Sequence, residues 1–170
     1  MTPVLETERL RLRGWLAADI EPLARFYADA ELSRFVGGPL DYGSAWRLLA
    51  LEAGHWMLRG YGMWVIDEKD GASFAGYCGL WEPGDWPELE IGWIFRGEFQ
   101  GRGYATEAAL RVRDFAYGEM KRTTLVSYID PENEPSKRVA RRLGAVYEKT
   151  IELRGHTVEA FRHPGPQSIN

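Results

Sequence analysis

The sequence predicts an α+β domain of three layers, in which a mixed, mostly antiparallel sheet carries helices on both faces. Apolar residues alternate strictly across residues 89–95, which is typical of a strand. They recur at helical spacing across residues 105–116. The predicted segments follow one another as strand, two helices, three strands, helix, strand, helix and two strands. The length of 170 residues suits one domain over residues 1–170, with a core of about residues 7–163.

Composition narrows the class of protein. The chain holds 21 basic and 25 acidic residues, a net charge of −4, which disfavours nucleic acid as the main partner. Cys78 is the single cysteine, so no internal disulfide or cysteine metal cluster can form. The N-terminus has no apolar signal core, and no apolar run approaches the length of a membrane span. We therefore expect a cytoplasmic protein without a membrane partner.

The first third of the chain predicts one strand and two helices. Arg9–Arg13 alternates leucine and arginine, so we expect a strand with its leucines inward and its arginines in solvent. Asp19 is a predicted N-cap for a helix that contains Ile20, Leu23, Ala24 and Tyr27. A mobile loop is expected at residues 35–40. A second helix then begins at Asp41 or Ser44 and ends near Gly60.

The middle of the chain predicts an antiparallel meander of three strands, over residues 61–67, 73–81 and 88–95. Its turns fall at Lys69-Asp70-Gly71 and at the Pro83–Pro87 segment. Gly76 and Gly79 lie within the second strand, where they are expected to weaken it or to mark bulges.

The last third predicts a helix to about Gly118, a strand over 124–129 and a helix over 134–143 that ends at Gly144. A hairpin with strands 145–153 and 157–163 follows. The tail from Pro164 onward is expected to fray.

The segment from Phe95 to Glu107 is the candidate ligand-binding site, because a strand there leads through a glycine-rich turn into a helix. Gly101 and Gly103 allow the backbone to turn sharply and to approach a ligand closely, because neither carries a Cβ. The free N–H groups of the first helical turn then favour a phosphate. No Lys-Ser or Lys-Thr follows the glycines, which excludes a Walker A loop, and the third glycine of a dinucleotide site is absent.

The hexapeptide Gln100-Gly101-Arg102-Gly103-Tyr104-Ala105 resembles the pyrophosphate loop of the GNAT family of N-acetyltransferases, Gln/Arg-x-x-Gly-x-Gly/Ala. The opening from Thr7 to Arg13 resembles the ribosomal-protein-alanine acetyltransferase (RimJ/RimL-like) branch of that family. The resemblance implies the acyl-CoA N-acyltransferase fold, with acetyl-CoA as co-substrate and no metal. It also implies that the strand before the loop and the strand after its helix are parallel neighbours that splay apart around the pantetheine arm.

A second segment, residues 130–144, resembles the family's Asn-x-x-Ser/Ala-x-x-Val/Leu-x-x-x-x-Gly sequence. By resemblance Asn133 binds the pantetheine arm, while both Asn133 and Ser136 also suit helix capping. Many members of the family carry a tyrosine acid where this chain has Ala140. Ser136 is therefore the candidate proton donor to the leaving thiolate.

The resemblance implies a set of cofactor-binding residues around the loop and the second segment. An oxyanion donor is expected at a backbone N–H near Trp93 or Ile94. The predicted cofactor-binding residues are Ile94, Phe95, Gln100, Gly101, Arg102, Gly103, Tyr104, Ala105, Thr106, Asn133 and Ser136.

Glu90 is the candidate general base. Strand alternation places it opposite the apolar row of its strand, and apolar neighbours would raise its pKa toward neutrality. A solvent-facing or salt-bridged Glu90 explains the pattern equally well. Glu82, Asp85 and Glu88 are the reserve candidates.

The predicted function is transfer of the acetyl group of acetyl-CoA to a primary amine by direct attack, with a protein N-terminal or small-molecule α-amine as acceptor. The alternative is a catalytically silent acyl-CoA-binding sensor or scaffold. The sequence leaves the oligomeric state open, and a homodimer is one of the alternatives. Trp81 and Trp86 flank a turn on the expected acceptor side, so that one of them would line a pocket, whereas most of the tryptophans and Cys78 are expected in the core.

Overall fold

The computed structural model describes residues 2–168. Its strands are β1 (Leu5–Glu6), β2 (Leu10–Arg13), β3 (Met63–Glu68), β4 (Gly76–Trp81), β5 (Glu90–Phe95), β6 (Val126–Ile129), β7 (Val146–Leu153) and β8 (His156–Arg162). Its α-helices are α1 (Ile20–Ala28), α2 (Ala30–Ser33), α3 (Tyr42–Arg59), α4 (Tyr104–Gly118) and α5 (Glu134–Arg142). Short 3-10 helices span Ala17–Asp19, Gly97–Phe99 and Pro166–Ser168. The predicted succession is confirmed, and β1, α2 and the 3-10 helices are additions to it.

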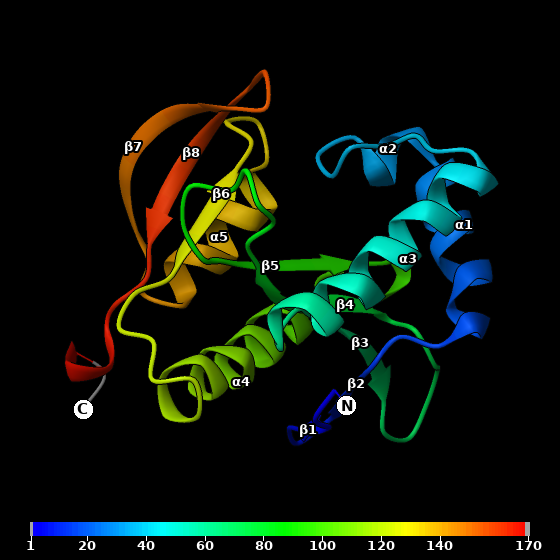
Figure 1. The fold of residues 1–170 in the computed structure, drawn as a ribbon, viewed down its shortest axis with the longest axis horizontal. Helices are drawn as coiled ribbons and strands as arrows, with labels where there is room; N and C mark the ends of the chain where they lie inside the picture. Colours follow the sequence, from blue (N-terminus) through cyan, green and yellow to red (C-terminus); the bar gives the residue numbers. More distant parts are fainter. Residues whose placement is uncertain (1, 169–170) are drawn as a thin grey trace.

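The eight strands form one sheet in the order β1-β2-β3-β4-β5-β6-β8-β7 (Figure 1). Every neighbouring pair is antiparallel except β5 and β6, which are parallel. That pair is joined through a single register position, Glu90 opposite Val126. The mixed, mostly antiparallel sheet is therefore confirmed, and β5 and β6 part soon after they meet.

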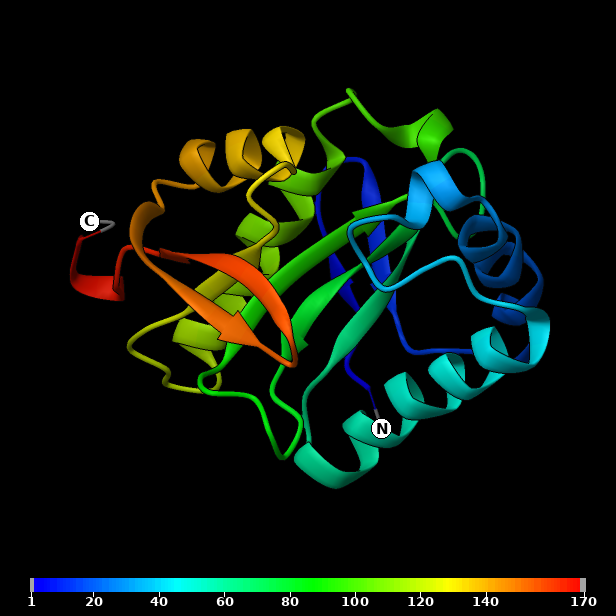
Figure 2. The ribbon, with the colours of Figure 1, turned by 90° about the horizontal axis from the view of Figure 1, so that it is seen from above.

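Helices cover both faces of the sheet (Figure 2). On one face, α4 packs Ala108, Val112 and Phe115 against inward residues of β2 to β5 such as Trp64 and Ile91. On the other face, α1 and α3 enclose a second core built on the alternate strand residues. A small third core lies under α5 and the C-terminal hairpin. The three predicted layers follow from this alternation, since successive strand residues point to opposite faces.

Close backbone contacts explain the glycines of β4. A Cβ at Gly76 would lie 2.2 Å from the carbonyl oxygen of Ile94, and one at Gly79 would lie 2.3 Å from that of Gly62. The register of β4 with both neighbours is unbroken. The expectation of bulges at these positions is therefore wrong, and glycine is needed there because the neighbouring backbones approach so closely.

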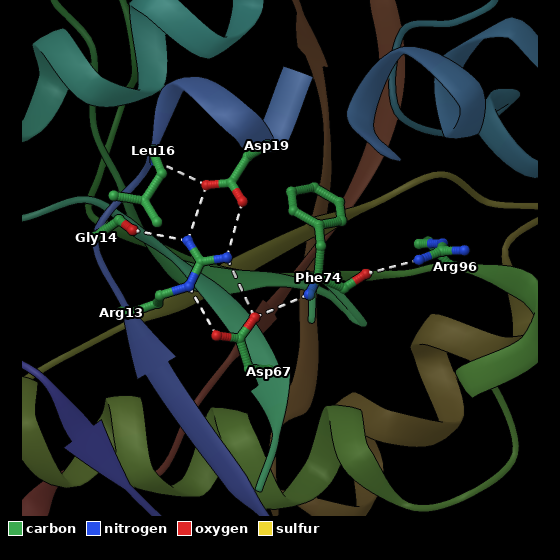
Figure 3. Close-up of polar contacts among 7 residues, drawn as sticks. All are labelled: Arg13, Gly14, Leu16, Asp19, Asp67, Phe74 and Arg96. Atoms are coloured by element: carbon green, nitrogen blue, oxygen red, sulfur yellow. Dashed lines mark hydrogen bonds and ion pairs between the residues drawn. The ribbon is translucent and has the colours of Figure 1, made fainter. Parts of the chain in front are cut away.

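Asp19 does not cap α1, which corrects the predicted N-cap. Its buried carboxylate accepts two hydrogen bonds from the Arg13 guanidinium, both of 2.8 Å, and one from the Leu16 N–H (Figure 3). Arg13 also donates to Asp67, whose carboxylate accepts from the Phe74 N–H. Arg13 is therefore a bridge between β2, β3 and the start of α1 rather than a solvated arginine, because two carboxylates surround it.

The other predicted helix ends hold. The Asp41 side chain accepts from the Ser44 N–H at 2.7 Å, so Asp41 is the N-cap of α3. Gly60 ends α3 in the left-handed conformation, and Gly144 follows α5 with φ +80°. Of the tail, residues 166–168 form a 3-10 helix, and the last two residues lie outside the described part of the chain.

No helix of residues 2–168 is long and apolar enough to cross a membrane. Within the same residues no group of three or more histidines, cysteines, aspartates or glutamates is arranged to hold a metal ion.

Candidate active site

The glycine loop connects the end of β5 to the start of α4. Gly101 and Gly103 have φ of +75° and +81°, a region that residues with a side chain rarely adopt. Nothing lies within 4 Å of a Cβ placed at Gly101, so the loop is open on that side. The first helical bond joins the Glu107 N–H to the Gly103 carbonyl, which leaves the N–H groups of residues 104–106 free of helical partners.

The side chains of the loop mostly turn back toward the protein. Gln100 donates from its amide to the Phe95 carbonyl at 2.9 Å, which closes the loop on its own strand. The Tyr104 hydroxyl donates to Glu68 at 2.6 Å, and Arg102 forms an ion pair with the same carboxylate. Phe95 is buried in the core against α4. These residues can therefore offer a ligand chiefly their backbone groups.

Arg9, which directly precedes β2, binds the glycine loop and the start of α4. Strand alternation did not predict this contact. Its guanidinium donates to Glu107 at 2.7 Å and to the Arg102 carbonyl at 3.0 Å. Glu107 also accepts from the Thr7 hydroxyl and from the Arg9 N–H. The start of α4 and the glycine loop are thus fixed to the N-terminal segment by charge-assisted bonds.

A cavity of about 500 Å³ lies beside the loop. The residues that line it are Glu8, Gly103, Thr106, Glu107, Leu110 and Arg142. The Thr106 hydroxyl has no hydrogen-bond partner within residues 2–168. Free helix N–H groups, an unpartnered hydroxyl and the Arg142 guanidinium make a donor set that fits the phosphates of coenzyme A. Leu110 and Arg142 were not predicted; Leu110 lies on α4 one turn after Thr106, and Arg142 reaches the loop only because α5 packs beside α4.

The gap between β5 and β6 exposes backbone groups of β5. Leu89, just before β5, and Ile91 direct their carbonyls toward β6, so Trp93 directs its backbone groups the same way by the two-residue period. Ile94 instead pairs with Tyr77 of β4. Because the pairing with β6 ends at Glu90, the Trp93 N–H has no ladder partner. Of the two predicted oxyanion donors, the geometry therefore favours Trp93.

A buried pair of side chains stands where the two strands part. The Ser127 hydroxyl donates to the Ile91 carbonyl at 2.7 Å and contacts the His163 imidazole at 2.9 Å. Burial lowers the pKa of His163 to about 4, so the ring is neutral at physiological pH. The Ser127 hydroxyl therefore occupies the Ile91 carbonyl, which a backbone N–H of β6 would bind if the ladder continued. The sequence carried no signal for it, because Ser127 and His163 are far apart along the chain.

Glu90 lies at the first position of β5, on the same face as Ile94 and opposite Trp81. Its carboxylate accepts from the Trp86 indole N–H at 2.7 Å and from the Tyr128 N–H at 3.3 Å. Desolvation raises the pKa of Glu90 to about 7, although these two hydrogen bonds act in the opposite direction. The carboxyl is thus half-buried among aromatic rings and forms none of the ion pairs found in the described structure.

The reserve carboxylates are engaged elsewhere. Glu88 forms two bonds to Arg162, at 2.7 and 2.9 Å, and these bonds lower its pKa. Asp85 is exposed and pairs with Arg154. Glu82 accepts from the Tyr61 hydroxyl and lines, with Glu88, a separate cavity of about 380 Å³. None of the three lies on β5 itself, Glu90–Phe95.

The second predicted segment begins α5. The Asn133 side chain accepts from the Ser136 N–H at 3.2 Å, so Asn133 is the N-cap of the helix. Ser136 is half-buried in the first turn, and Ala140 is buried one turn later. The proton-donor role of Ser136 therefore stays a prediction.

Comparison with known proteins gives consistent matches. The family model described as acetyltransferase (GNAT) domain matches residues 9–146. The uncharacterized protein YkkB of Bacillus subtilis strain 168 is 32% identical over 155 residues, 86% of this chain and 87% of that protein. The crystal structure of the acetyltransferase from Agrobacterium tumefaciens str. C58 has a TM-score of 0.87 at 34% identity, and the match covers 96% of this chain and 95% of that one.

A more distant match is the ribosomal L7/L12 alpha-N-protein acetyltransferase RimL, solved in complex with coenzyme A. It has a TM-score of 0.74 at 19% identity, and the match covers 95% of this chain and 98% of that one. At this identity the match shows a shared fold.

Proposed function

Because the chain belongs to the acetyltransferase (GNAT) family and is an acetyl-CoA-dependent N-acetyltransferase, we propose that its acceptor is an α-amine that Glu90 deprotonates. The observation that carries this proposal is the half-buried Glu90 carboxyl, whose pKa desolvation raises to about 7. An amine must lose its proton before it can attack a thioester. A carboxylate that titrates near neutrality is suited to accept that proton.

The choice of an α-amine rests on matched proton affinities. An α-amino group has a pKa of about 8, whereas a lysine side chain has a pKa of about 10.4. A base that titrates near 7 deprotonates an α-amine at a much smaller free-energy cost than a lysine side chain. The cost rises by about 1.4 kcal/mol for each unit by which the amine's pKa exceeds that of the base. The fold shared with an alpha-N-protein acetyltransferase supports a polypeptide N-terminus as one such acceptor. A free amino acid or another small α-amine is the alternative.

Acetyl-CoA supplies the acetyl group as a thioester. We propose that the Trp93 N–H donates to the thioester carbonyl oxygen as negative charge develops there, because this N–H lacks a partner on β6. The amine nitrogen forms its bond to the carbonyl carbon, the carbon–sulfur bond breaks, and the sulfur takes up a proton. We assign that proton donation to Ser136, since Ala140 stands where many relatives carry a tyrosine.

The residues proposed to hold the cofactor surround the glycine loop. The N–H groups of residues 104–106, the Thr106 hydroxyl and the Arg142 guanidinium would bind the phosphates, and Asn133 would bind the pantetheine arm. A catalytically silent acyl-CoA-binding module was the alternative from the sequence. Family membership favours the enzyme.

The test is a thiol-release assay with acetyl-CoA and four acceptor classes: peptides with a free N-terminus, the same peptides with a blocked N-terminus and a free lysine, amino acids, and polyamines. We expect release with α-amines and little with the lysine-only peptides. Glu90→Gln should lower kcat/KM at pH 7 by at least about 10-fold and recover activity at pH 9, where more of the amine is already free.

Glu88→Gln is the matched control, since Glu88 is a carboxylate near the start of the same strand that pairs with Arg162. It should not show the recovery at alkaline pH. Acetylation of lysine-only peptides at rates equal to those of α-amines would refute the choice of acceptor. A Glu90→Gln profile parallel to that of the parent would refute the choice of base.

A further inference from the structure

Helix α3 carries apolar residues on both of its faces. Its inner face packs Leu48 and Leu49 against the core between α1 and the sheet. Its outer face exposes five large apolar side chains: Tyr42 (54% exposed), Trp46 (56%), Leu51 (51%), Met57 (88%) and Leu58 (86%). A surface helix of a monomeric protein normally places charged and polar residues on that side. We call these five residues, with Ala50 and Ala53 between them, the outer α3 face.

The outer α3 face lies at the periphery of the molecule. Figure 2 shows α3 along one edge of the fold, with no other element of residues 2–168 beyond it. With side-chain areas on the order of 150–250 Å² each, the exposed fractions amount to roughly 600 Å² of apolar surface. The largest patch on a typical monomer is about 300–600 Å², and a stable interface buries about 800 Å² per partner. This one helix therefore supplies most of the area that a specific interface needs.

We propose that the outer α3 face is the interface between two copies of this chain, packed with their α3 helices antiparallel about a two-fold axis near Ala50 and Leu51. The midpoint of α3, Tyr42–Arg59, falls between these two residues. A two-fold interface must be complementary to itself, so each residue faces one equally far from the midpoint. This pairs Leu58 with Gly43, Met57 with Ser44 and Leu51 with Ala50, a large side chain opposite a small residue at each of these positions.

Charge at the two ends of α3 favours the antiparallel arrangement. At the N-terminal end, the Tyr42 hydroxyl donates to the Glu21 carboxylate at 3.2 Å. At the C-terminal end, Arg59 is exposed. In the antiparallel arrangement Arg59 of each copy lies near Glu21 of the other, whereas a parallel arrangement would bring the two Arg59 side chains together. Opposite charges at both ends therefore select one direction of packing.

Charge also favours a protein partner over a lipid surface. A helix that lies on a membrane normally carries lysines and arginines along its polar side, which attract anionic lipids. The middle of the exposed side of α3 carries Arg47 as its one charged residue, and the chain has a net charge of −4. Lipid binding is therefore an outcome for the experiment to exclude.

The first test measures the mass of the full chain in solution by light scattering, from 1 to 100 µM. We expect twice the chain mass of 19.4 kDa at the upper concentrations. A variant with both Met57→Lys and Leu58→Lys should run as the monomer and weaken association by more than about 100-fold, because unpaired charges would be buried in the interface. Circular dichroism and acetyl-CoA binding should match the parent, which shows that the variant is folded.

Val146→Lys is the matched control, since Val146 is also exposed but lies on the edge strand β7. It should leave the dimer intact. A monomeric parent at 100 µM would overturn the proposal. So would a parent dimer that survives the α3 substitutions, or one that is lost in Val146→Lys.

The second test fixes the direction of packing by disulfide formation. The only native thiol, Cys78, is buried, so a new surface cysteine reports on the interface alone. Ala50→Cys lies beside the proposed axis and should cross-link two copies under mild oxidation. Gly43→Cys lies at the helix end, about 20 Å from its counterpart in the other copy at 1.5 Å per residue, beyond disulfide reach. Equal cross-linking of both variants would overturn the antiparallel arrangement, and binding of the parent to vesicles of neutral lipid, lost in the lysine variant, would assign the face to lipid instead.

Discussion

Replacement of Trp86 by phenylalanine tests the assignment of the base without touching the carboxylate. The indole N–H of Trp86 donates to Glu90 at 2.7 Å and stabilises its charged form. Phenylalanine keeps an aromatic ring in place but removes the donor. The protonated form of Glu90 is then favoured, so its pKa should rise above the present value of about 7.

The size of the shift follows from the strength of the lost bond. A hydrogen bond to a charged group contributes about 1.5–3 kcal/mol, and water at this half-buried site would replace part of it. A net loss of about 1.4 kcal/mol corresponds to about one pKa unit. A base with a pKa of about 8 instead of 7 is roughly 8-fold less ionised at pH 6.5 and almost equally ionised at pH 9. The kcat/KM of the variant should therefore be roughly 8-fold below that of the parent at pH 6.5 and almost equal to it at pH 9.

The assay is thiol release at saturating acetyl-CoA, with one α-amine acceptor, from pH 5.5 to 9.5. The acceptor's own titration is identical for both proteins, so a displaced acid limb reports on the enzyme. Trp81→Phe is the control, because Trp81 contacts Trp86 edge to face but donates no bond to Glu90. A Trp86→Phe profile that overlays the parent's, or an equal shift in Trp81→Phe, would refute the role of Glu90 as the base.

Three further predictions follow from other residues. Gly103→Val should weaken coenzyme A binding by at least about 10-fold in calorimetry, because valine at φ +81° distorts the loop; an unchanged affinity in a folded variant would contradict the phosphate site. Ser136→Ala should lower kcat with little change in acetyl-CoA affinity, and a lower melting temperature with unchanged kcat would show that Ser136 only supports the helix. Burial raises the pKa of Glu52 to about 8, so the folded state holds an extra proton between about pH 4.5 and 8, and stability should decline as the pH rises through that window. Glu52→Gln should remove this decline and be more stable at pH 8 by on the order of 1–3 kcal/mol in denaturant unfolding; parallel pH dependences for the two proteins would refute it.

The sequence by itself determined the order of the elements and the position of the glycine loop. Strand alternation, helical spacing and the caps at Asp41, Gly60 and Gly144 depend on residues within a few positions of one another. The positive φ angles of Gly101 and Gly103 are likewise a local property of residues without a Cβ. Such features can be identified from a sequence because they depend only on residues that are close together along the chain.

The environment of Glu90 was predicted in part. Alternation correctly placed it away from the apolar row of β5, and desolvation raises its pKa as expected. Its Tyr128 donor could not be predicted, since Tyr128 comes from β6 and reaches Glu90 only because the two strands are parallel neighbours. Whether the carboxylate was solvated or enclosed depended on that pairing.

Only the tertiary structure decided which distant groups meet. Arg9 braces the glycine loop from nearly a hundred residues away, and Arg142 reaches the loop's cavity because α5 packs beside α4. Asp19 had the sequence of an N-cap, but its carboxylate binds the Arg13 guanidinium, because a bidentate contact between two opposite charges is stronger than a bond to one backbone N–H. Contacts of this kind are set by the packing of whole elements, and no local period in the sequence records which elements become neighbours.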